Sequence, residues 1–235
     1  MIEKRPFDSL GRFDADWLAA RYHFSFSGYR DPARMQWGSA LRVWNDDTIQ
    51  PKTGFPPHPH SDMEIITYVR TGAITHQDSM GNRGRTEAGD VQVMSAGSGV
   101  THAEYNLEDG ETTLYQIWIL PKERGGTPYW GAAKFPKADR AGALVTLASG
   151  FEQDQAAGAL PIRQDARVLA ATLAKGQSVS YPVESGRHAY LTVAKGSASV
   201  NGVELGPRDG AAIRDEPEIR VTAGADAEIV LVDAP

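Results

Sequence analysis

Short apolar runs, separated along the whole chain by glycine and proline, restrict this sequence to a fold made of many short strands. The 235 residues include 24 glycines and 14 prolines, and these turn-forming residues are spread through the entire length. Between them lie runs such as residues 65–69, rich in β-branched side chains, and the longer apolar segment 112–120. Apolar runs of this length between turn residues are typical of strands. We therefore predict an all-β protein.

The second half of the chain repeats the first in outline, which indicates two copies of one structural unit. Residues 190–196 align with residues 66–72, and residues 206–210 align with residues 87–91. The dipeptide Asn201-Gly202, between two apolar runs, is a strong signal for a two-residue hairpin. We expect two small antiparallel β-barrels in tandem, with residues 1–130 forming the first domain and residues 131–235 forming the second.

Charge and composition exclude several classes of function. The formal net charge is −6 and no run of Lys or Arg is longer than a pair, which argues against a nucleic-acid-binding surface. The sequence shows neither an apolar signal-peptide region nor an apolar stretch of about 18 residues, so no secretory signal and no membrane-spanning helix are expected. Cysteine is absent, which excludes disulfides, thiolate metal sites and a cysteine nucleophile. A cytoplasmic location follows as the default.

Two pairs of side chains in the first half have the spacing of metal ligands: His58 with His60, and His102 with Glu104. On an extended strand, residues i and i+2 project from the same face, about 7 Å apart. If the two pairs lie on neighbouring strands, three imidazoles and one carboxylate converge on one point. Such a set suits Fe(II), Mn, Co, Ni, Cu or Zn, and four ligands on an octahedral ion leave two positions open. The alternative is that these histidines are surface residues that stabilise turns.

The second copy lacks this set of side chains. Pro182 and Glu184 occupy the positions that correspond to His58 and His60, and no histidine lies near Val221, where the second pair would fall. We therefore expect one metal site per chain, in the N-terminal barrel only. A barrel that can fold without the metal leaves chemistry or sensing as the purpose of the site, and we favour chemistry.

The remaining histidines are better explained by structural roles. His23 lies among alternating aromatic residues, which favours a hydrogen-bonded position in the core. His76 precedes a loop, and we expect it to have a structural role or to contact a metal ligand. His188 stands at the second-copy position that matches Glu64, where its partners are absent, and is interpreted as structural.

Several longer motifs resemble the pirin family of bicupins. They are residues 54–64 (GFPPHPHSDME), 78–82 (DSMGN), 89–99 (GDVQVMSAGSG) and 102–106 (HAEYN), preceded by residues 23–26 (HFSF), Tyr29 and Asp31-Pro32. The resemblance implies two tandem cupin domains, with one divalent metal, usually iron, in the N-terminal one. It carries over His58, His60, His102 and Glu104 as the ligands. Glu64 stands where many cupins place a ligand, so it is either an alternative ligand or a residue that supports the ligands.

The same resemblance implies an oxidoreductase, because bacterial members are associated with quercetin 2,3-dioxygenase activity. Glu104 would then be the catalytic base that takes the proton of the flavonol 3-hydroxyl. The partners would be a flavonol-like small molecule and O2, with no nucleic acid and no membrane. The alternative is a metal- or redox-sensing regulator that acts through a protein partner, since eukaryotic members are described as nuclear transcription cofactors.

Overall fold

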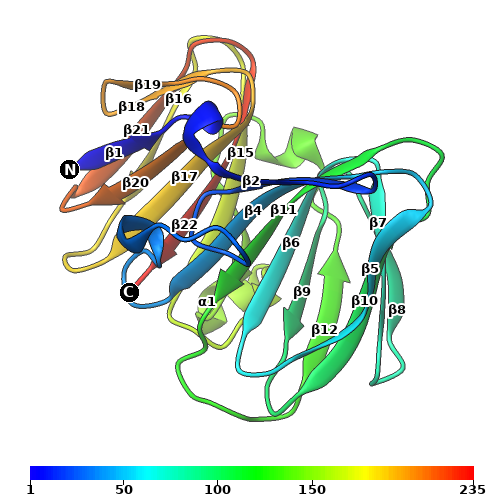
Figure 1. Ribbon diagram of the computed structural model, residues 1–235. Coiled ribbons are helices and arrows are strands. Elements are labelled where there is room, and N and C mark those ends of the chain that lie inside the picture. The colour runs from blue at the N-terminus through cyan, green and yellow to red at the C-terminus, as the bar shows by residue number, and fades with distance from the viewer.

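The computed structural model describes residues 1–235 as strands joined by turns, and four sheets are arranged in two pairs (Figure 1). The strands of the first pair are β2 (Gly11–Asp14), β3 (Leu18–Tyr22), β4 (Leu41–Ile49), β5 (Thr53–His60), β6 (Glu64–Thr71), β7 (Ala73–Asp78), β8 (Arg83–Glu87), β9 (Val91–Ser95), β10 (Val100–Asn106), β11 (Thr112–Ile119) and β12 (Tyr129–Ala133). They form a large sheet with the order β12-β9-β6-β11-β4-β3-β2 and a small sheet with the order β5-β10-β7-β8.

The second pair of sheets repeats this plan. Its strands are β1 (Ile2–Arg5), β13 (Val145–Ser149), β14 (Leu160–Pro161), β15 (Arg167–Leu173), β16 (Ser178–Pro182), β17 (His188–Lys195), β18 (Ala198–Val200), β19 (Val203–Leu205), β20 (Gly210–Arg214), β21 (Glu218–Ala223) and β22 (Ala227–Ala234). The large sheet has the order β1-β20-β17-β22-β15-β13-β14, and the small sheet has the order β16-β21-β18-β19. The predicted all-β fold with two tandem barrels is confirmed.

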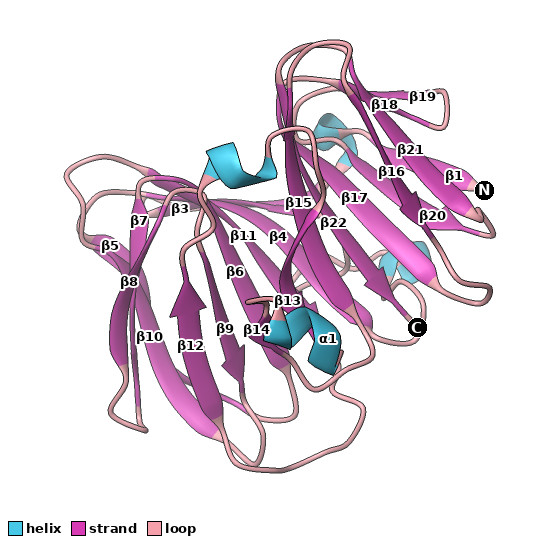
Figure 2. Ribbon diagram, turned by 180° about the vertical axis from the view of Figure 1, so that it is seen from behind, coloured by secondary structure: helices cyan, strands magenta, loops and turns pink.

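Helical segments are few and short. They are α1 (Glu152–Ala156) and three 3-10 helices, Phe7–Ser9, Pro32–Arg34 and Lys137–Arg140. Figure 2 shows them from behind, in the connections between strands rather than within the sheets. None of the helices is long and apolar enough to cross a membrane.

The first strand of the chain pairs with the far sheet, which the sequence did not indicate. Strand β1 is antiparallel to β20, with Ile2 opposite Ile213 and Arg5 opposite Gly210. Figure 1 shows β1 at the edge of the sheet formed by the C-terminal half. The division into residues 1–130 and 131–235 stays a prediction, but residues 2–5 contribute their backbone hydrogen bonds to the second unit.

The two large sheets pack against each other, and the core between them joins the two units. It contains 23 buried apolar residues drawn from both halves of the chain, among them Trp44, Tyr68 and Tyr190. A partly buried ion pair also crosses this interface, because Arg208 Nε donates to the buried Asp46 Oδ2 at 2.6 Å. One face of the large sheet of the first barrel therefore packs against the other unit, and its opposite face lines the interior of its own barrel.

The lumens of the two barrels differ in polarity. In the second barrel, 19 buried apolar side chains fill the space between the sheets. The first barrel has only two small apolar clusters, of seven and four buried residues. Between these clusters lies a polar row, in which each residue is paired in register with the next across β3, β4, β11, β6 and β9: Tyr22, Asn45, Gln116, Thr67 and Gln92. Buried polar groups cost free energy unless they are hydrogen-bonded. A polar row in place of apolar core packing therefore points to a function in the interior of this barrel.

Candidate metal centre

Three of the four predicted ligands meet in the small sheet of the first barrel. Strands β5 and β10 are antiparallel neighbours, and their register places His102 opposite His58 and Val100 opposite His60. The ring centroids lie 4.5 Å apart for His58 and His102, 4.8 Å for His58 and His60, and 5.0 Å for His60 and His102. One ring nitrogen of each lies within 4.8 Å of the others. The i, i+2 spacing therefore produces the expected convergence of imidazoles.

The prolines around these histidines are tolerated because β5 is the edge strand of its sheet. Between the pairs His102–His58 and Glu104–Phe55, β10 advances by two residues while β5 advances by three, so β5 contains a bulge. Pro56 and Pro57 lie inside this bulge, where a missing N–H disrupts no ladder hydrogen bond. A bulge re-aims the side chain beside it, which here is His58.

Hydrogen bonds direct a free nitrogen of two histidines toward the centre. His58 Nδ1 lies 2.7 Å from the Pro56 carbonyl, which can only accept, so Nδ1 carries the proton and Nε2 keeps its lone pair. His102 Nε2 is buried and has no hydrogen-bond partner in the protein. A buried nitrogen without a partner requires an explanation, and a metal ion supplies one. The donor set thus fits a divalent transition metal.

His76 supports His102 from the neighbouring strand β7. Its Nε2 donates to Asp78 Oδ2 at 3.0 Å, which leaves its Nδ1 to accept from His102 Nδ1 at 3.4 Å. Asp78 in turn accepts from the backbone N–H and the side-chain amide of Asn82. Trp130 stacks on His76, with the rings 9° from parallel and 4.9 Å apart. This histidine–carboxylate arrangement fixes the tautomer of a ligand, as commonly found behind metal-binding histidines.

Burial lowers the pKa of both His60 and His102 below the usual value of 6.5, to about 4 and about 3 respectively. The neighbouring imidazoles lower them further: His102 and His58 act on His60, and His58 and His76 act on His102. Both rings are therefore neutral at pH 7, which is the form that binds a metal.

The fourth predicted ligand, Glu104, is buried behind the histidines and held by the polar row. Its Oε1 accepts from Gln92 Nε2 at 2.6 Å and from Thr67 Oγ1 at 3.3 Å, and its Oε2 accepts from Gln116 Nε2 at 2.7 Å. We call Gln92, Thr67 and Gln116 the carboxylate clamp. The Glu104 carboxylate lies within 4.8 Å of ring nitrogens of His76 and His102, in a second group that shares only His102 with the group of His58, His60 and His102.

Asp47 is a second carboxyl group in the same lumen, on the face of β4 that carries Asn45. It is only 1% exposed, and neither its Oδ1 nor the Oδ1 of Asn45 has a hydrogen-bond partner. Burial, followed by the negative charges of Asp46 and Glu104, raises the pKa of Asp47 from 3.8 to about 8. No motif or spacing in the sequence singled out this residue.

Glu64 lies on the opposite face of the large sheet from the histidines. It is buried between the two units, where it accepts hydrogen bonds from Ser95 Oγ and from the backbone N–H of Arg163. His23 is likewise at this interface, with Nδ1 2.8 Å from the hydroxyl of Tyr190. The structure thus places both residues in structural contacts between the halves of the chain.

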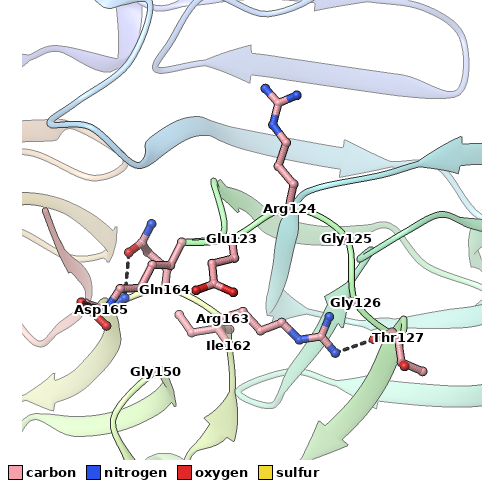
Figure 3. A pocket seen from close by; sticks show the side chains of 11 residues that line it. Glu123, Arg124, Gly125, Gly126, Thr127, Gly150, Ile162, Arg163, Gln164 and Asp165 are labelled. Atoms are coloured by element: carbon pink, nitrogen blue, oxygen red, sulfur yellow. Dashed lines mark hydrogen bonds and ion pairs between the residues drawn. The ribbon is translucent and has the colours of Figure 1, made fainter.

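Two surface cavities lie near the first barrel. A hollow of about 410 Å³ reaches His60 and is lined by Pro59, His60, Ser61, Ser79, Gly99, Val100 and Thr101. A second cavity, of about 540 Å³, lies between residues 122–127 and residues 162–165 (Figure 3). There Arg163 donates to the Thr127 carbonyl, while the Arg124 side chain points away from the other residues shown. None of the predicted ligands lines the second cavity, whereas His60 lines the first.

Comparisons with known proteins cover both halves of the chain. The family model described as Pirin matches residues 3–119, and the model described as Quercetinase C-terminal cupin domain matches residues 146–234. A pirin-like protein of Caulobacter vibrioides is 64% identical over 234 residues, which are 100% of this chain and 100% of that protein. A quercetin 2,3-dioxygenase of Escherichia coli is 41% identical over 236 residues, covering 100% of this chain and 99% of that protein.

A solved structure matches over the same extent. The bacterial pirin YhhW from Escherichia coli, in complex with nickel(II), has a TM-score of 0.93 at 39% identity and covers 100% of this chain and 99% of that chain. The tandem arrangement of two cupin barrels is therefore shared with a relative whose structure was determined with a divalent metal.

Proposed function

Because the chain belongs to the pirin family, we propose that it is a metal-dependent dioxygenase that uses O2 to cleave a flavonol such as quercetin. The observation that carries the proposal is the convergence of three imidazoles, two of them neutralised by burial, beside a buried carboxylate. A relative named quercetin 2,3-dioxygenase supports the reaction, and a relative solved with nickel(II) supports a divalent metal.

The proposed ligands are His58, His60, His102 and Glu104. Fe(II) is the metal we propose first, with Mn, Ni, Co, Cu and Zn as alternatives that the same donor set accepts. A bound metal of this kind would supply Lewis acidity and, if redox-active, electrons for dioxygen chemistry. With a divalent ion bound, three neutral imidazoles and one carboxylate would leave a net positive charge at the centre, which favours an anionic oxygen of the substrate.

Glu104 is the residue proposed to take the proton of the flavonol 3-hydroxyl. In all three of its hydrogen bonds the carboxylate is the acceptor. One acceptor position on Oε2 remains after Gln116 has donated to it. Because this one position would accept either a metal or the proton, Glu104 would have to leave the metal to take the proton, which it would hold until it is returned to the product.

An apolar cluster beside His60 is suited to a flat aromatic substrate. Ile65, Met94 and Val100 are buried there, with Met63 and Trp118 partly buried against them. The Trp118 ring is 5.0 Å from that of His60 and nearly perpendicular to it. Such a wall packs against aromatic rings and keeps water from the charged oxygen formed in the reaction.

The test is oxygen uptake by purified, iron-loaded protein with quercetin added, together with carbon monoxide in the headspace. The same protein reconstituted with Mn, Ni, Co or Cu extends the assay to the other metals. His188→Ala, a histidine substitution in the other barrel, is the control and should leave uptake unchanged. The absence of oxygen uptake with any of these metals would overturn the proposal and favour a metal- or redox-sensing regulator that acts through a protein partner.

A further inference from the structure

Hydrogen bonds fix the orientation of the Gln116 amide, the member of the carboxylate clamp on β11. Gln116 Oε1 accepts from the indole Nε1 of Trp118 at 3.2 Å, and an indole nitrogen can only donate. The amide of Gln116 must therefore point its oxygen at Trp118 and its NH2 group at Glu104. Trp118 thus controls the orientation of Gln116 without touching the carboxylate.

The β9 side of the clamp is directed in the same way. Gln92 Oε1 accepts from Thr86 Oγ1 at 3.0 Å, and Gln92 Nε2 donates both to Glu104 Oε1 and, at 3.5 Å, to Thr67 Oγ1. Since Thr67 Oγ1 accepts from Gln92, its own proton is free to be donated to Glu104. Both amides consequently present hydrogens, and only hydrogens, to the carboxylate.

The hydrogen bonds to Glu104 are unequally divided between its two oxygens. A carboxylate has about four lone-pair positions, two on each oxygen. Gln92 and Thr67 together occupy those of Oε1, whereas Gln116 occupies one of those of Oε2. One lone pair of Oε2 is therefore the remaining acceptor of the group.

We propose that the carboxylate clamp makes Glu104 a single-point ligand, able to donate only one lone pair of Oε2 to a metal, and that Trp118 and Thr86 maintain this arrangement as positioning residues. The inference rests on the proposed metal site and specifies how its carboxylate acts. With the clamp intact, Oε1 is held by the large sheet and the carboxylate cannot bind through both oxygens. Without it, Glu104 gains the freedom to bind through either oxygen or both.

The test measures metal binding rather than turnover. Gln116→Leu and Gln92→Leu each remove one side of the clamp, and Trp118→Phe removes only the donor that orients Gln116. Trp37→Phe is the matched control, because the indole nitrogen of Trp37 also donates one hydrogen bond at 3.2 Å, to the Ile213 carbonyl, and its ring packs against the core between the two units. Each metal-free protein is titrated calorimetrically with Ni²⁺, and the Cu²⁺-loaded proteins are compared by electron paramagnetic resonance.

We expect the two leucine variants to bind Ni²⁺ about 10- to 100-fold more weakly, as is typical when a partner of a metal ligand is removed. Trp118→Phe should weaken binding by about 2- to 10-fold, the effect of one neutral hydrogen bond. The copper spectra of these three variants should differ from that of the wild type, whereas Trp37→Phe should match the wild type in both measurements.

Affinities within about two-fold of the wild type, with unchanged copper spectra, would overturn the clamp while leaving the metal site intact. If a leucine variant does not fold, Trp118→Phe decides the question, because it keeps an aromatic ring in the same place. Failure of the wild type to bind Ni²⁺ or Cu²⁺ would overturn both the clamp and the metal centre. Metal binding without oxygen uptake would overturn only the proposed reaction.

Discussion

Replacing Asp47 by Asn should stabilise the metal-free protein, and the gain should grow with pH. Asp47 is fully buried in the lumen with an unpaired oxygen, and its pKa is raised to about 8 in the folded protein, against 3.8 in an unfolded chain. Above pH 3.8 the unfolded chain releases this proton while the folded protein retains it. The free energy of unfolding therefore falls as pH rises, until the folded form also releases the proton near pH 8.

The size of this loss in the free energy of unfolding follows from the difference between the two pKa values. Each pH unit between them costs about 1.4 kcal/mol of stability. From pH 3.8 to pH 7 the loss amounts to about 4 kcal/mol. Asn has nearly the shape of the protonated acid but does not titrate, so the variant escapes this loss. Its advantage over the wild type should be small near pH 4, close to its maximum by pH 8, and constant above it.

Urea unfolding followed by tryptophan fluorescence, at several pH values between 4.5 and 8.5 and with metal removed by a chelator, measures this difference. Asp78→Asn is the control of opposite sign. Burial alone would raise the pKa of Asp78, but hydrogen bonds from His76 and Asn82 outweigh it and lower the pKa. That variant should lose stability throughout this range. A difference between wild type and Asp47→Asn that does not change with pH, or a wild type that is more stable at pH 7, would refute the reasoning.

Three further predictions concern the metal centre and the contact between the barrels. Glu104→Gln should still bind Ni²⁺ through the histidines but lower quercetin-dependent oxygen uptake by about 10²- to 10⁴-fold, the usual contribution of a general base; unchanged uptake would remove Glu104 from the mechanism. Because the pKa of His60 is about 4 and that of His102 about 3, protons should compete with Ni²⁺ at these two ligands only below about pH 4, and calorimetry from pH 5 to 8 should show no loss of affinity attributable to them. Arg208→Leu leaves the buried Asp46 without one of its partners and should lower the free energy of unfolding by about 3 kcal/mol or more, measured in urea; a loss below 1 kcal/mol would show that this pair adds little to the interface.

The sequence was most informative where local spacing determines geometry. Side chains alternate between the two faces of a strand, so the i, i+2 spacing by itself places His58 and His60 on one face. Glycine and proline spacing likewise predicted short strands. The repeat between the two halves predicted tandem barrels.

What the sequence missed depends on contacts between distant strands. The residues 2–5 have no pattern that names β20 as their partner, because backbone pairing is not encoded in side-chain identity. The carboxylate clamp did leave a signal: Gln92 and Gln116 interrupt strands that are otherwise apolar. A polar residue at an interior position of a buried strand requires a partner, and that partner was the predicted ligand Glu104.

The pairing of β1 with β20 has a consequence for how the chain assembles during synthesis. Ile2 is opposite Ile213, so the first strand cannot pair until more than 200 residues have followed it. At translation rates of about 5–20 residues per second, that wait is on the order of 10–40 s. During this time β1 is unpaired beside a partly synthesised barrel, and unpaired strand edges promote aggregation. The long sequence separation of this contact also raises the contact order of the fold, and folding is slower when the contact order is high. The N-terminal strand, although it is synthesised first, can therefore pair only after β20 has been made.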